Sequence, residues 1–125
     1  MATEPTEDRL RLQLEQEIEQ LWSIMCKTTD DVRLLTEKYG MKAIDGMENP
    51  TIDDMLAITK KLDNICSKVL EVLNGDAIKG YIDTRLLLNA KQMYIYFSKM
   101  IVAYKAENIN DFLEARDHLK SQAHF

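Results

Sequence analysis

A seven-residue repeat of apolar side chains near the N-terminus constrains the fold more than any other feature of this sequence. From Leu14 to Tyr39 the repeat advances in alternating steps of four and three residues, with Thr28 as its one polar member. A stripe of this period keeps a narrow seam of a long α-helix turned toward its neighbours. The unbroken phase predicts one continuous helix over residues 6–39, although residues 28–31 resemble a helix start.

Three further segments show helical spacing of their apolar residues. The segment 51–73 begins with Thr51 as a capping residue and has Asp54 where a capping box usually has Glu or Gln. The segment 84–107 is apolar around most of its circumference, which is typical of a helix covered by several neighbours. A short helix over residues 110–121 follows an Asn-rich turn.

These elements predict an all-α fold, an antiparallel helical bundle of three long helices and a short C-terminal one. We expect a single domain over residues 1–125, with residues 1–5 as a disordered tail. The chain has only 4 Gly and 2 Pro residues, too few for the many turns of an all-β sandwich or barrel.

The charge balance argues against two classes of partner. The 16 basic residues are scattered among 21 acidic ones, and the net charge is −5. Nucleic acids and anionic lipids both require concentrated Lys and Arg, so neither is an expected partner. No apolar run is long enough to span a membrane, and the acidic, polar opening differs from a signal peptide. With two cysteines as well, the sequence favours a cytoplasmic protein.

Residues that could carry chemistry do not cluster in the sequence. Glu114 and His118 share a helix face, but no second group of ligands accompanies them, so we expect no metal site. Cys26 and Cys66 adjoin apolar stripes and have no neighbouring histidine, so we interpret both as small hydrophobic residues. We therefore expect no catalytic residues and no cofactor.

The length of the first helix suggests where a partner binds. A helix over residues 6–39 would be about 50 Å long, and the next two would reach only about 33–36 Å. The long helix should overhang its neighbours, which would leave Leu10 and Leu14 exposed in a single chain. A second copy or a helix of another protein could cover them.

Three more residues are candidates for this contact. Trp22 lies slightly off the seam, where it packs on a third helix or anchors a subunit contact. Met41 and Met47 lie in the first loop, where they either tuck under the bundle or meet a partner. The predicted function is thus a non-catalytic helical interaction module (an adaptor, chaperone or regulator) that binds protein partners and self-associates through helix one.

Two alternatives stay open. The first is a ligand-binding or enzymatic bundle with a pocket between helices, for which the candidate lining residues are Tyr94, Tyr96, Tyr104, Cys66 and His118. The second is a nucleic-acid regulator that uses the lysine band Lys91, Lys99 and Lys105, which the net charge disfavours.

Overall fold

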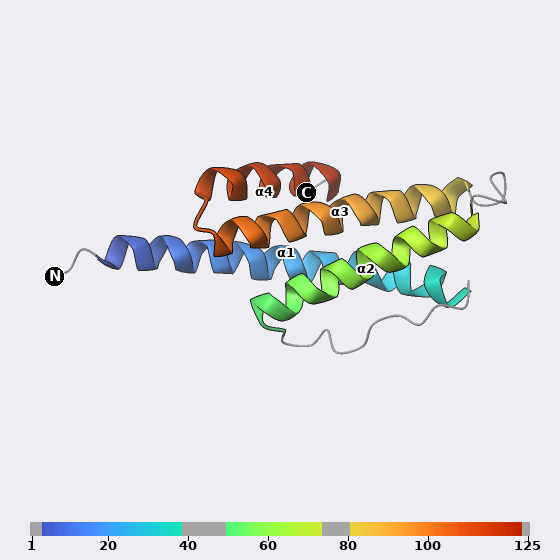
Figure 1. The fold of residues 1–125 in the computed structure, drawn as a ribbon, viewed down its shortest axis with the longest axis horizontal. Coiled ribbons are helices and arrows are strands. Elements are labelled where there is room, and N and C mark those ends of the chain that lie inside the picture. The colour runs from blue at the N-terminus through green and yellow to red at the C-terminus, as the bar shows by residue number, and fades with distance from the viewer. Residues whose placement is uncertain (1–3, 39–49, 74–80, 124–125) are drawn as a thin grey trace.

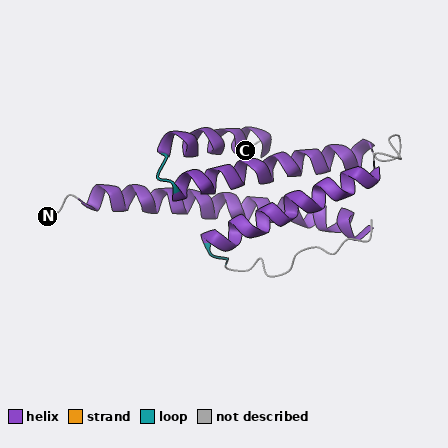
Figure 2. Cartoon of the chain, viewed as in Figure 1, coloured by secondary structure: helices purple, strands orange, loops and turns teal. Residues whose placement is uncertain are grey.

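The computed structural model describes residues 4–38, 50–73 and 81–123, and its regular elements are all α-helices (Figures 1 and 2). The helices are α1 (Glu4–Lys38), α2 (Ile52–Leu73), α3 (Tyr81–Lys105) and α4 (Ile109–Ala123). The predicted class, three long helices and a short one, is confirmed. The first helix is continuous through residues 28–31, as its heptad phase predicts.

The helices do not all alternate in direction. α3 runs antiparallel to α2, and α4 runs antiparallel to α3, whereas α1 and α2 point the same way (Figure 1). Thirteen residues separate Lys38 from Ile52, and an extended chain of that length can reach about 43 Å. This exceeds the roughly 33 Å length of α2, so a return to the starting end of the bundle is feasible.

The beginning of α2 is fixed by a reciprocal cap. The Thr51 hydroxyl accepts a hydrogen bond from the Asp54 backbone N–H at 3.1 Å, and the Asp54 carboxylate accepts one from the Thr51 N–H at 3.1 Å. Two backbone donors that a helix start leaves unpaired are thereby satisfied. The capping box predicted from the sequence is confirmed, with Asp in the position of the usual Glu.

α3 lies at the centre of the bundle and contacts the other three helices. Tyr94 and Phe97 are fully buried on it, together with Leu87, Ala90, Met100 and Ile101. These residues recur on one broad side, which explains the nearly all-round apolar composition of this segment. The prediction that this is the central helix is confirmed.

α1 packs on this centre through the seam that the heptad repeat predicts. Its buried residues are Leu14, Ile18, Leu21, Trp22 and Met25. The Trp22 ring lies 5.5 Å from the ring of Phe97 in α3, tilted by 47°. Of the two packing options for Trp22, the structure shows the contact with the third helix.

Candidate functional site

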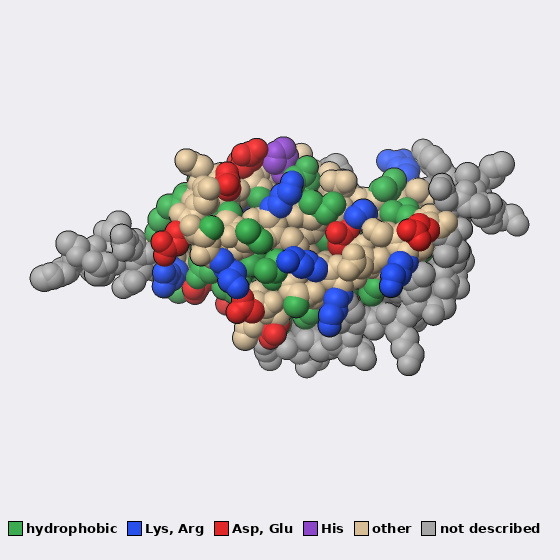
Figure 3. All heavy atoms as spheres, viewed as in Figure 1, with side chains coloured by type: hydrophobic (Ala, Val, Ile, Leu, Met, Phe, Trp, Pro, Cys, Tyr) green, Lys and Arg blue, Asp and Glu red, His purple; other side chains and the backbone are tan. Residues whose placement is uncertain are grey.

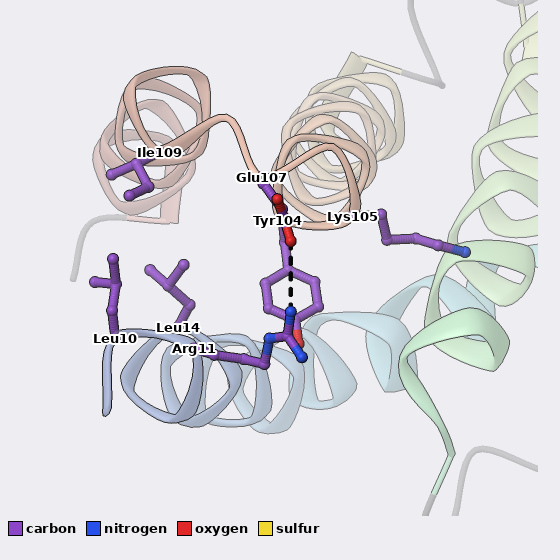
Figure 4. Close-up of a pocket in the computed structure, with 7 residues that line it drawn as sticks. All are labelled: Leu10, Arg11, Leu14, Tyr104, Lys105, Glu107 and Ile109. Atoms are coloured by element: carbon purple, nitrogen blue, oxygen red, sulfur yellow. Dashed lines mark hydrogen bonds and ion pairs between the residues drawn. The ribbon is translucent and has the colours of Figure 1, made fainter. Parts of the chain in front are cut away.

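A groove lies at one end of the bundle, where α1 passes the turn between α3 and α4. We call it the end groove. It has a volume of about 390 Å³. Its lining residues, drawn in Figure 4, are Leu10, Arg11 and Leu14 of α1, Tyr104 and Lys105 of α3, Glu107 of the turn and Ile109 of α4.

The turn that forms one wall of the end groove is sharply defined. Glu107 has a φ of 59°, in the left-handed region that glycine usually occupies at a helix C-terminus. The Asn108 N–H reaches the Ala103 carbonyl at 2.9 Å and the Glu107 N–H reaches the Tyr104 carbonyl at 3.1 Å. This pair of bonds is a Schellman motif, which terminates α3 at Lys105, two residues before the predicted end.

Asn108 then starts the next helix. Its side-chain oxygen accepts a hydrogen bond from the Asp111 N–H at 3.1 Å, and its amide donates to the Asp111 carboxylate at 2.7 Å. One residue thus joins the end of α3 to the start of α4. Because the chain reverses within so few residues, Ile109 is placed opposite the first turns of α1 (Figure 4).

The wall of the end groove formed by α1 and α4 is apolar. Leu10 and Leu14 project from α1 toward Ile109 (Figure 4). Leu14 is 9% exposed, Ile109 is 39% exposed and Leu10 is half-buried. Exposure therefore increases from the floor outward, which leaves an apolar cleft open to solvent at the bundle end.

The remaining wall is polar and connects α1 with α3. The Tyr104 hydroxyl donates a hydrogen bond to the Glu15 carboxylate. At the rim, Arg11 and Glu107 form a salt bridge of 3.4 Å, with both side chains well exposed. An exposed pair of this kind contributes about 0–1 kcal/mol, so it shapes the rim more than it stabilises the bundle.

The hydrogen bond between Tyr104 and Glu15 predicts a specific alkaline response. Desolvation and the contact with Glu15 raise the pKa of Tyr104 from 10.0 to about 12. The neutral phenol is the form that stabilises the fold, so its contribution is complete below pH 10 and is lost as the pH rises toward 12. We expect Tyr104→Phe to cost about 1 kcal/mol at neutral pH.

The same variant should lose less stability than the wild type between pH 10 and 12, because it lacks this titrating group. Urea unfolding followed by circular dichroism at several pH values measures both effects. Equal alkaline losses in the two proteins would show that the pKa of Tyr104 is not raised in the folded protein.

Of the five residues predicted to contact a partner, two line the end groove and one lies elsewhere. Leu10 and Leu14 line it, whereas Trp22 packs in the core. Met41 and Met47 lie outside the described residues. The expectation that Leu14 is exposed in a single chain is wrong, because the α3–α4 turn covers this part of the seam.

Sequence reasoning missed three other residues that line the end groove, Arg11, Glu107 and Ile109. Arg11 carries no motif, and nothing in its spacing signals a contact with Glu107, 96 residues away. Ile109 gave a weak signal, since it is an apolar residue within a polar turn. The left-handed backbone of Glu107 gave none, because the sequence has no Gly or Asn there.

The residues named for the pocket alternative do not share one pocket: Tyr104 lines the end groove, whereas Tyr96 and His118 line a groove between α3 and α4. Tyr94 and Cys66 are fully buried and line neither the end groove nor the groove between α3 and α4 described below. Burial raises the pKa of the Cys66 thiol to about 12, with a further contribution from Asp63, while Lys91 acts in the opposite direction. Tyr96 and His118 stack with ring centres 4.9 Å apart.

The lysine band is largely paired with acids. Lys91 forms a salt bridge with Asp63 at 2.5 Å, and Lys105 forms one with Asp53. Lys99 instead lies over the Tyr96 ring, with its ammonium nitrogen 5.5 Å from the ring centre. Two of the three lysines therefore bind α2 to α3.

Within residues 4–38, 50–73 and 81–123, the His, Cys, Asp and Glu side chains form no group of three suited to holding a metal ion. In the same ranges, no helix combines the length and apolarity needed to cross a membrane. Comparison with protein-family models, curated protein sequences and solved structures finds no match for the chain.

Proposed function

We propose that this protein is a non-catalytic helical interaction module, of the adaptor, chaperone or regulator kind, whose end groove binds a helix of another protein. The observation that carries the proposal is the open apolar cleft between Leu10, Leu14 and Ile109. Partner helices dock by inserting apolar side chains into such clefts.

The placement of α1 supports a helical occupant. α1 extends from Leu10 back to Glu4, so about 10 Å of helix continues past the cleft. This segment protrudes at the end of the bundle (Figure 1). An incoming helix can therefore lie along the first turns of α1 while its apolar face meets Ile109. The charged rim, with Arg11 and Glu107, surrounds this contact as a polar border typical of interfaces.

Charge substitutions inside and outside the end groove test the proposal. We expect Leu10→Glu to lower the amount of captured partner protein by at least about tenfold, because the substitution places a charge in the apolar cleft. The measurement is quantitative affinity capture from the source cells, with each captured protein compared between variants.

Leu12→Glu is the matched control, since Leu12 lies two residues away on the same helix and is already 55% exposed. It should retain the partners that Leu10→Glu loses, and Ile109→Glu on α4 should lose the same set. If Leu10→Glu and Leu12→Glu capture identical sets in equal amounts, the end groove is not the binding site. Circular dichroism should show that all three variants are as helical as the wild type.

A further inference from the structure

A second groove runs between the outer sides of α3 and α4, and we call it the α3–α4 groove. It has a volume of about 560 Å³. Three of its lining residues are Ala103, Ala106 and Ala115, whose small side chains leave the groove open. Val102 on its α3 edge is 51% exposed. This combination presents apolar surface that another helix can approach closely.

The two edges of the α3–α4 groove carry opposite charges. Lys99 lines the α3 edge, and Asp111 and Glu114 line the α4 edge. Among the described residues, neither Lys99 nor Glu114 takes part in a salt bridge. Figure 3 shows the corresponding mixture of basic, acidic and hydrophobic side chains over the face formed by α2, α3 and α4.

The register of the two helices places Lys99 and Glu114 level with each other. Tyr96 of α3 stacks on His118 of α4, and Asn89 accepts a hydrogen bond from Gln122 farther along. α3 and α4 are antiparallel, so a later residue of α3 is level with an earlier residue of α4. Lys99 follows Tyr96 by three residues and Glu114 precedes His118 by four, so the two lie at nearly the same position along the groove. Lys99 and Glu114 therefore stand across the groove from each other.

A surface with one basic and one acidic edge at the same height is complementary to itself. A twofold axis along the groove brings the α3 edge of one copy over the α4 edge of the other. Each Lys99 then faces the Glu114 of the second copy, and the exposed Val102 on each α3 edge meets the α4 edge of the other copy. At the rim of the end groove, by contrast, Arg11 is already paired with Glu107 of the same chain.

We propose that two copies of this chain associate through the α3–α4 groove, with Lys99 of each copy paired to Glu114 of the other. The proposal goes beyond the end groove, because it concerns a different surface and a different partner. The sequence predicted self-association through helix one, but Leu14 and Trp22 are buried within the chain. The proposal therefore places the contact between copies on α3 and α4 instead.

Charge reversal with mixing tests this proposal by size-exclusion chromatography with light scattering. We expect the wild type to have the mass of two chains. Lys99→Glu and Glu114→Lys should each weaken the affinity of the two copies for each other by at least about tenfold. The dimer contains the contact twice, so each substitution creates two pairs of like charges. A one-to-one mixture of the two variants should recover the dimer, since both contacts are then between opposite charges.

A second pair of variants tests the apolar part of the contact. Val102→Glu should give monomers, while Leu88→Glu should leave the dimer intact. Leu88 is 46% exposed on the same helix but is not among the residues that line the α3–α4 groove. Leu10→Glu should also leave the dimer intact, which separates this proposal from that of the end groove. A monomeric wild type, or single charge variants that remain dimeric, would overturn the proposal.

Discussion

Trp22→Ala is expected to lower the free energy of unfolding by about 3–5 kcal/mol, the usual cost of removing a large buried aromatic side chain. Trp22 is only 6% exposed and its ring meets that of Phe97, which is fully buried in α3. Its removal would leave a cavity at the contact between α1 and the central helix. Chemical unfolding followed by circular dichroism measures the loss.

The size of this effect distinguishes a core residue from a partner contact. Leu12→Ala serves as the control, because Leu12 is 55% exposed on the same helix and its loss should change stability by about 0.5 kcal/mol or less. If Trp22→Ala unfolds at the same denaturant concentration as the wild type, Trp22 does not pack on Phe97 in solution. The predicted role of Trp22 as a subunit anchor would then regain support.

The Cys66 thiol is expected to react with iodoacetamide about a thousandfold more slowly in the folded chain than in the unfolded one. Burial first, and the Asp63 carboxylate second, raise the pKa of Cys66 from 9.0 to about 12. The thiolate is the reactive form, so a rise of this size removes most of it at neutral and mildly alkaline pH. Complete burial of the side chain also blocks the reagent.

Peptide mass spectrometry over a time course, with and without denaturant, measures this protection. Cys26 is the internal control: burial also raises the pKa of its thiol, but the side chain is only half-buried and should react first. The neutral Cys66 thiol favours folding, so its contribution is complete below pH 9 and is lost as the pH approaches 12. Rapid native labelling of Cys66 would favour the alternative of an accessible pocket.

Local and periodic features of the fold could be predicted from the sequence. The seam of α1 and the capping box at Thr51 depend on neighbouring residues alone, so their signals are complete within a short segment. The central position of α3 follows from its apolar circumference. The left-handed Glu107 could not be predicted, because its conformation depends on the Schellman bonds around it and its residue type is unusual there.

The candidate site was predicted only in part, for a geometric reason. Comparing helix lengths correctly indicated that α1 extends past its neighbours, but lengths do not show where along α1 those neighbours end. The α3–α4 turn lies against Leu10 and Leu14, so it covers Leu14 and converts the expected open seam into a cleft. Ile109 completes this cleft through a chain reversal that sequence spacing does not encode.

The proposal for the end groove is tested most directly by placing a photoreactive side chain in it. Benzoylphenylalanine would replace Leu10 in one variant and Leu12 in another, and each would be irradiated in the source cells. A third variant would carry the same photoreactive residue in place of Ile109. The account predicts covalent adducts with the same partner protein from positions 10 and 109, and few or none from position 12. Equal adducts from positions 10 and 12, or none from position 10, would contradict it.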